Sequence, residues 1–108
     1  MAVASAGTAT QTAVIDTPHT LDTESTAGVY VLVVDTGNLA LGDKVVLTIM
    51  TKAAAGGTSR VAYKQTYSDP QADPIKYSPP VPVDTEIVCI LEQTDGTGRD
   101  FLWNLLVM

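Results

Sequence analysis

Few residues in this chain have side chains that could perform covalent chemistry. His19 is the only histidine and Cys89 the only cysteine, so a Cys–His pair is the one thiol nucleophile that the sequence allows. Cys89 alternates with Ile87 and Leu91 in a strand-like run, which is typical of a buried structural thiol. The chain has no Gly-x-Ser-x-Gly motif to present a nucleophilic serine. We therefore expect no catalytic residue and no enzymatic activity.

Loop carboxylates and glycines are the remaining candidates for a metal or nucleotide site. Zinc requires several Cys or His ligands, and the two present cannot complete a site. Asp69, Asp73 and the segment Asp95–Asp100 lack the spacing of an EF-hand loop, and turn formation accounts for them. The segment Gly96–Arg99 resembles half of a phosphate-binding loop, but no helix N-terminus follows to bind the anion. We expect neither a metal nor a cofactor.

Aromatic side chains could line a carbohydrate site. They make up 6% of the chain and are Tyr30, Tyr63, Tyr67, Tyr77, Phe101 and Trp103. Phe101 and Trp103 are two residues apart in a strand-like run, so both point to one face, and we interpret them as core residues. A carbohydrate- or host-surface-binding module stays open as an alternative function.

The charge balance argues against nucleic-acid and membrane partners. Six Lys and Arg stand against twelve Asp and Glu, giving a formal net charge of −6, and the basic residues are scattered. A phosphate backbone or an anionic membrane surface requires a cationic patch. No apolar run approaches the roughly 20 residues of a membrane span, and the first residues do not resemble a signal peptide, so we expect synthesis in a cytoplasm. Only 17% of the residues are charged, which suits burial in an assembly.

Strands, not helices, must position these residues. Apolar and β-branched residues gather in short runs separated by turn residues, and no segment has helical periodicity. The expected strands are residues 12–15, 28–35, 44–52, 58–67, 75–77, 83–93 and 101–108. A chain of 108 residues suits one domain. We predict an all-β fold, a single small β-sandwich or jelly roll of six to seven antiparallel strands over residues 13–108.

Turn residues and prolines predict the connections between these strands. Residues 18–27 are expected to be loop. Gly56 and Gly57 predict one hairpin, and the Gly-rich residues 94–98 predict a second hairpin that places the C-terminal strand inside the sheet. The Pro-rich residues 78–82 are expected to cross between sheets or to guard a sheet edge.

The N-terminal segment and the core complete the expected architecture. Residues 1–12 are small and polar, so we predict a flexible N-terminal arm that could become ordered on a neighbouring subunit. Leu39 and Leu41 are expected to plug one end of the core. The other expected core residues are Val31, Val33, Val45, Leu47, Ile49, Val61, Tyr63, Ile87, Cys89, Leu91, Phe101 and Trp103.

Two stretches of the chain carry a family resemblance. The first is Gly56–Tyr63, and the second comprises Ser78–Pro82, Glu86–Val88 and Leu91–Trp103. Together they resemble a family of short, mostly uncharacterised proteins encoded among tailed-phage virion genes, and the match covers residues 28–108. The resemblance implies a structural role in the virion and transfers no catalytic residue.

The expected function combines this resemblance with the scarcity of reactive groups. We expect a capsid-associated decoration or cement protein that is located in the virion and stabilises it by non-covalent contacts. The major capsid protein or other virion proteins are the expected partners, and the copies are expected to form a homo-oligomer. A head–tail or tail component is the second reading, beside the carbohydrate- or host-surface-binding module.

Overall fold

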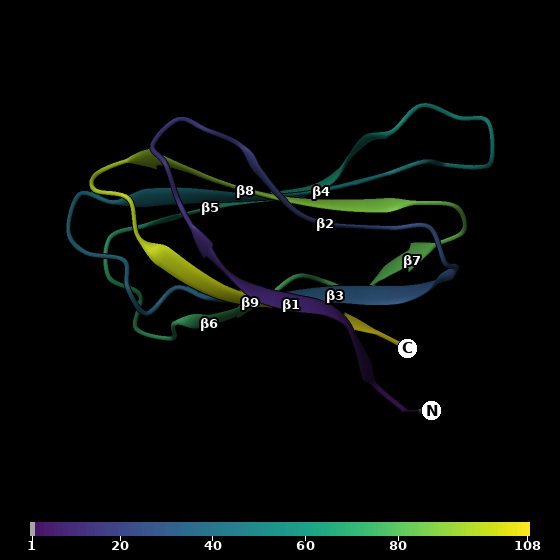
Figure 1. Ribbon diagram of the computed structural model, residues 1–108, viewed down its shortest axis with the longest axis horizontal. Coiled ribbons are helices and arrows are strands. Elements are labelled where there is room, and N and C mark those ends of the chain that lie inside the picture. Colours follow the sequence, from purple (N-terminus) through teal and green to yellow (C-terminus); the bar gives the residue numbers. More distant parts are fainter. Residues whose placement is uncertain (1) are drawn as a thin grey trace.

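Two antiparallel β-sheets pack face to face in the computed structural model, which describes residues 2–108 (Figure 1). These residues contain no helix. Their strands are β1 (Ala4–Thr12), β2 (His19–Glu24), β3 (Gly28–Asp35), β4 (Lys44–Thr51), β5 (Arg60–Ser68), β6 (Ile75–Tyr77), β7 (Val81–Val83), β8 (Ile87–Asp95) and β9 (Asp100–Val107). The predicted all-β sandwich is confirmed, with nine strands instead of six to seven.

The strand order defines two sheets. Sheet A has the order β1-β9-β3-β6, and β7 pairs with β3 as well; sheet B has the order β2-β8-β4-β5. The predicted β4–β5 hairpin is present, and Gly56 in its turn has a φ of 81°, which favours glycine. The predicted edge role of the Pro-rich segment is also confirmed. Between β6 and β7, Ser78 exchanges two hydrogen bonds of 2.9 Å with the backbone of Leu32 and so continues the edge of sheet A.

The last two strands do not form the predicted hairpin. β8 belongs to sheet B and β9 to sheet A, so Gly96–Arg99 crosses from one sheet to the other. The buried Gln93 side chain holds this crossing, because its Nε2 donates to the carbonyl oxygens of Asp95 and Thr97 while its Oε1 accepts from the Arg99 N–H. The C-terminal strand does lie inside a sheet as expected, between β1 and β3.

The prediction of a flexible arm over residues 1–12 is wrong for the described residues. β1 pairs with β9 along its whole length and ends at Thr12, so the expected strand at 12–15 is misplaced too. Three hydroxyls of β1 donate hydrogen bonds to β9, and Ser5 Oγ donates to Asn104 Oδ1 at 2.6 Å. Thr8 Oγ1 donates to the carbonyl oxygen of Trp103, and Thr12 Oγ1 donates to Asp100 Oδ1, both at 2.7 Å. Hydrogen bonds therefore stabilise this strand, whose small side chains bury little apolar surface.

Residues 18–27 were expected to be loop, yet they contain strand β2. This strand pairs antiparallel with β8, and a register shift lies between Thr20 and Asp22. Its sequence is largely polar, with Leu21 as its single large apolar residue. The strand therefore has no apolar alternation from which it could be predicted.

The core lies between the sheets and confirms most of the predicted residues. Leu39 is buried and Tyr63 packs half-buried against the core, as expected. The prediction that Leu41 belongs to the core is wrong, because it lies in an exposed turn beside Gly42 and is 85% exposed. The other correctly predicted core residues are Val45, Leu47, Ile49, Ile87, Cys89, Leu91, Phe101 and Trp103.

On β3 the predicted face is wrong. Val31 and Val33 are half-buried on the outer face, whereas Tyr30, Leu32 and Val34 are buried in the core. Both faces of β3 carry apolar side chains, so alternation alone does not identify the inner one.

Val61 was expected in the core but is exposed, because β5 contains a bulge. Ile49 pairs with Tyr63 while Met50 pairs with Val61, so Ala62 is an extra residue in the ladder. An inserted residue reverses the alternation between the two parts of the strand that flank it, here between Tyr63 and Val61. Val61 therefore shares the outer face with Met50.

Candidate functional site

Cys89 and His19 were considered for nucleophilic chemistry, and the structure places each of them in a structural environment. Cys89 is fully buried, and this burial, with the charges of Asp22 and Glu24, raises the pKa of its thiol to about 12. The thiolate, which is the nucleophilic form, is therefore not populated at neutral pH. His19 lies on β2 opposite Leu91, and its Nε2 accepts the backbone N–H of Val14 at 3.1 Å.

The loop carboxylates are dispersed and contact segments that are distant in the sequence. Asp69 Oδ1 accepts the Gly42 N–H at 2.8 Å, and Asp95 pairs with Lys44 at 3.4 Å on the surface. Among residues 2–108 no cluster of three or more His, Cys, Asp or Glu could hold a metal ion, and no helix there is long and apolar enough to span a membrane.

Asp43 is a buried carboxylate at the end of the sandwich where the chain crosses between β8 and β9. Its Oδ2 accepts the Arg99 Nε–H at 2.7 Å and the Ala40 N–H at 2.8 Å, and its Oδ1 accepts the Thr97 N–H at 3.2 Å. Burial alone would raise the pKa of this carboxyl, but these hydrogen bonds and the Arg99 charge together lower it below its ordinary value. The arrangement is a structural lock for the crossing loop.

Asp43 should therefore contribute to acid unfolding. A carboxyl whose pKa is lowered on folding stabilises the fold above its ordinary pKa of 3.8, and this stabilisation disappears as the pH falls through the lowered value. We expect Asp43→Asn to be less stable than the parent at pH 7, and the gap to shrink below about pH 4. Urea unfolding of both proteins over this pH range measures the gap. A gap that stayed constant down to pH 2 would contradict the assignment.

The aromatic side chains do not gather into one carbohydrate-binding surface. Tyr30, Phe101 and Trp103 lie in the core, as was expected for the last two. Tyr63 and Tyr67 lie half-buried on the inner side of β5, where Lys76 approaches the Tyr67 ring to 5.1 Å. Burial first, and then the hydrogen bond with Tyr67, raise the pKa of Tyr63 to about 12. Tyr77 is the one largely exposed aromatic residue among those described.

The outer face of sheet A is the surface best suited to contact another protein, because it exposes several large apolar side chains. Six apolar side chains share this face on neighbouring strands, and we call them the outer patch: Val31, Val33, Ile75, Tyr77, Leu102 and Leu106. Two polar residues interrupt the patch, since Asp35 lies between Leu102 and Ile75, and Asn104 lies opposite Val33. The strand register places Tyr77 opposite Val33, and Val31 opposite Leu106. Leu102 is 55% exposed and Tyr77 63% exposed. Large side chains exposed together in this way mark contact surfaces on soluble proteins.

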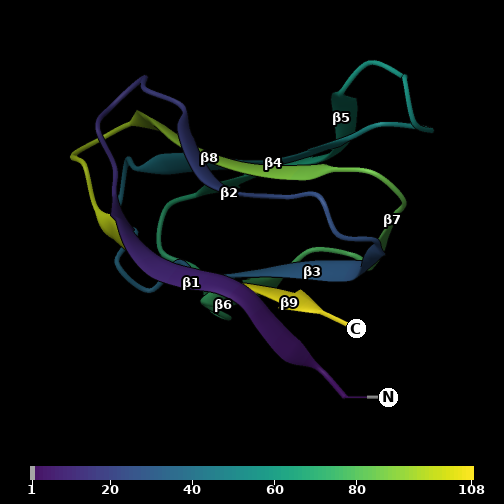
Figure 2. The ribbon, with the colours of Figure 1, turned by 45° about the vertical axis from the view of Figure 1, so that its right-hand side comes forward.

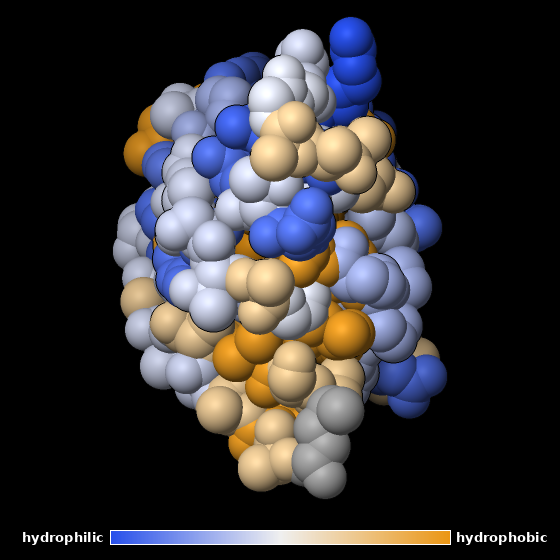
Figure 3. All heavy atoms as spheres, turned by 90° about the vertical axis from the view of Figure 1, so that its right-hand side faces the viewer, coloured by the Kyte–Doolittle hydropathy of each residue, from blue (hydrophilic) through white to orange (hydrophobic). Residues whose placement is uncertain are grey.

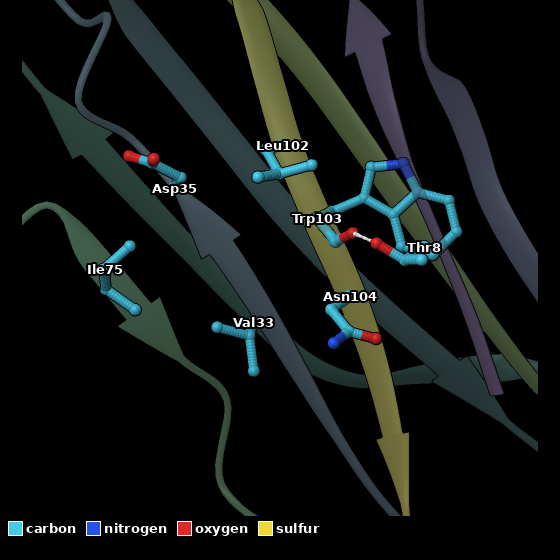
Figure 4. Close-up of a pocket in the computed structure, with 7 residues that line it drawn as sticks. All are labelled: Thr8, Val33, Asp35, Ile75, Leu102, Trp103 and Asn104. Atoms are coloured by element: carbon cyan, nitrogen blue, oxygen red, sulfur yellow. Dashed lines mark hydrogen bonds between the residues drawn. The ribbon is translucent and has the colours of Figure 1, made fainter. Parts of the chain in front are cut away.

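A shallow hollow lies within the outer patch (Figure 4). Its volume is about 170 Å³, below the roughly 300–1,000 Å³ of most small-molecule pockets. Thr8, Asp35 and Asn104 supply polar groups around the apolar side chains of the patch, and Trp103 contributes to the wall. A hollow of this size fits one side chain of a protein partner better than a sugar or a nucleotide.

A second apolar area lies where the two chain termini meet. Val3 and Met108 are exposed there, and the pairing of Ala4 with Val107 sets them side by side. Figure 3 faces this end of the molecule and shows hydrophobic residues gathered in its lower half, around the termini. Sheet A therefore exposes apolar side chains in two areas, the outer patch and this one.

Sequence reasoning did not identify the outer patch. Val31 and Val33 were assigned to the core, and nothing in the sequence shows that Leu102 and Tyr77 share a surface, because they come from strands far apart in the chain.

Comparison with known proteins adds no assignment, since no protein-family model, no curated protein and no solved structure matches this chain.

Proposed function

We propose that this protein is a structural component of a phage virion, a capsid-associated decoration or cement protein that acts through non-covalent contacts. The observation that carries the proposal is the outer patch, an exposed apolar face on a helix-free sandwich. A protein that fastens neighbouring shell subunits needs such a preformed face, since rigid surfaces bind without a large cost in ordering. The resemblance of residues 28–108 to virion-module proteins points to the same role.

The charge distribution supports a protein partner over nucleic acid. The net charge is −6, and the only charged side chain that lines the hollow in the outer patch is the acidic Asp35. The major capsid protein is the partner that the proposal names. It would insert an apolar side chain into the hollow beside Leu102 and cover the neighbouring valines, as anchor residues do at the centre of stable interfaces.

A head–tail or tail component would use the same kind of surface, so the place of attachment separates it from a decoration protein. The carbohydrate-binding reading has less support, because Tyr77 is the only largely exposed ring in residues 2–108 and the hollow is small. Sugar sites in proteins commonly stack rings against the pyranose face and need more aromatic surface than this.

A charge placed in the outer patch should remove the protein from particles. We expect Leu102→Lys to lower the number of bound copies at saturating protein by at least about tenfold, because truncating or charging a central anchor costs more than about 1.4 kcal/mol. The measurement is quantitative mass spectrometry of purified particles incubated with each variant. Leu41→Lys is the matched control, since Leu41 is exposed in the β3–β4 turn, outside the patch. Equal numbers of bound copies for the two variants would show that the outer patch does not attach the protein to the particle.

A further inference from the structure

Three of the four sheet edges carry features that prevent pairing with another strand. The β2 edge has Asp22 and Glu24 together with a register shift, and the β5 edge has Arg60 and Lys64. The edge formed by β6 and β7 consists of two three-residue strands and includes Pro82. Charges, prolines, irregular registers and short strands are the usual protections of exposed edges.

The fourth edge, β1, has neither charge nor proline. It is nine residues long, and within the described residues only β9 pairs with it, so its other side is free. In Figure 2 this strand lies at the near side of sheet A and runs out toward the N-terminus. Its one irregularity is a register shift between Ser5 and Gly7, which leaves residues 7–12 as a regular stretch.

The backbone groups on the free side of β1 can be assigned from the antiparallel alternation. The Ala13 N–H donates to the Arg99 carbonyl oxygen at 2.9 Å, so residue 13 points its backbone groups toward β9. Alternate residues of an antiparallel ladder point the same way, so Ala9 and Gln11 also face β9. Thr8, Thr10 and Thr12 are left with their N–H and C=O groups on the open edge. In agreement with this, the Thr12 carbonyl oxygen accepts the Gln11 side-chain amide at 3.0 Å.

These three threonines make the edge complementary to itself. A two-fold axis at Thr10 would pair Thr10 with its copy and Thr8 with Thr12 in both directions. Thr–Thr pairs across antiparallel strands are favourable, and β-branched residues suit strands. The neighbouring Ala9 is small and exposed, whereas the space beside Gly7 is filled by the Asp22 carboxylate and the Trp103 ring of the same chain.

Charge permits a second copy of the same chain at this edge. Two molecules of net charge −6 repel each other, and β1 adds nothing to this repulsion because it carries no charged side chain. Two carboxylates do contact the strand: Asp100 accepts the Thr12 hydroxyl, and Asp22 lies against Gly7. The first charged side chain in the sequence is Asp16, which makes residues 1–15 free of charged side chains. β1 lies wholly inside that segment.

We propose that β1 pairs antiparallel with β1 of a second copy, across a two-fold axis at Thr10, and joins two copies of sheet A into one continuous sheet. The outer patches of both copies then lie on the same side of that sheet, next to the joint. This interface does not depend on the proposed virion role. A monomeric protein could still attach to a particle through its outer patch, and a dimer could form in the absence of any particle.

Sedimentation of the full-length chain tests the proposal. One paired strand buries less than the roughly 1,200 Å² of a stable interface, so we expect a monomer–dimer equilibrium visible between micromolar and millimolar concentration. Thr10→Pro removes an N–H that β9 does not use, and should raise the dissociation constant at least about thirtyfold, because two hydrogen bonds are lost per dimer. Thr10→Ala, which keeps the N–H, should change it less than about threefold. A parent that stays monomeric at millimolar concentration, or equal dimerisation by all three proteins, would overturn the interface.

Amide hydrogen exchange gives a second readout that needs no variant. In the parent, the Thr8 and Thr10 amides should exchange about tenfold or more slowly at high protein concentration than at low, because pairing buries them. The Ala9 and Gln11 amides bond to β9 in either state and should not respond to concentration. If Thr10→Pro disrupts folding, this measurement decides alone, and protection of Thr8 and Thr10 that is independent of concentration overturns the proposal.

Discussion

Trp103→Ala should lower the free energy of unfolding by about 3–5 kcal/mol, the usual cost of truncating a large buried aromatic residue. Trp103 is 6% exposed and lies on β9, which pairs with both β1 and β3 in sheet A. Removing its ring leaves a cavity between the sheets beneath β9 and its two neighbouring strands, β1 and β3. Because domains of this size are stable by only about 5–15 kcal/mol, the variant should be at the margin of folding. Equilibrium urea unfolding, followed by far-UV circular dichroism, measures the change.

The adjacent Leu102 provides the control for this prediction. Its side chain points to the outer face and is 55% exposed, so Leu102→Ala should change the free energy of unfolding by no more than about 0.5 kcal/mol. Similar losses at both positions would mean that the inner and outer faces of β9 are assigned incorrectly. The pair therefore tests the orientation of β9, which contributes Leu102 and Leu106 to the outer patch.

Gly96→Ala should destabilise the protein by about 3 kcal/mol, from a strained backbone and the loss of hydrogen bonds to Asp43. Gly96 has a φ of 89°, which disfavours every residue with a Cβ. An added Cβ would also overlap Asp43 Oδ1 and lie 2.9 Å from the Asp43 Cα, so the backbone must shift. That shift would displace the carboxylate that binds Arg99 and Thr97.

Gly56 separates the two causes. It too has a positive φ, of 81°, but a Cβ there would meet no atom within 4 Å. Gly56→Ala should therefore cost only the backbone strain, about 1–2 kcal/mol. The difference between the two variants in urea unfolding measures the contribution of the Asp43 lock. Equal losses would show that the carboxylate adjusts freely and that the lock contributes little.

The strongly apolar strands could be predicted from the sequence because burial requires apolar residues on a regular pattern. The run Gly28–Asp35 matches β3 at both ends, and the alternation Ile87, Cys89, Leu91 predicted the inner face of β8. The same signal was missing for β1 and β2. Their polar residues form strands through hydrogen bonds to β9 and β8, and these depend on partners about 60 to 100 residues away in the chain.

Local signals also failed where tertiary contacts decide the course of the chain. The residues Thr94–Gly98 look like a hairpin turn, but buried Gln93 and Asp43 bind the loop and direct β9 into the other sheet. A glycine-rich loop is compatible with both outcomes. The bulge at Ala62 similarly exposes Val61, although the sequence alternates without interruption there.

The outer patch was beyond sequence reasoning for a related reason. Its members alternate with core residues on β3 and β9, so the same apolar pattern that predicts a strand hides which face is exposed. Only the pairing of β6 with β3 brings Ile75 and Tyr77 to that face. A surface assembled from three separate strands has no signature in any one of them.

The central claim is that this chain works as a structural part of a phage particle, and locating it in that particle tests the claim most directly. Cryo-electron microscopy of the purified virion, with copy number from quantitative mass spectrometry, is the measurement. We predict density for the sandwich at many symmetry-related positions on the capsid, with the outer face of sheet A against the shell. Particles that contain no copy of the chain would contradict the claim.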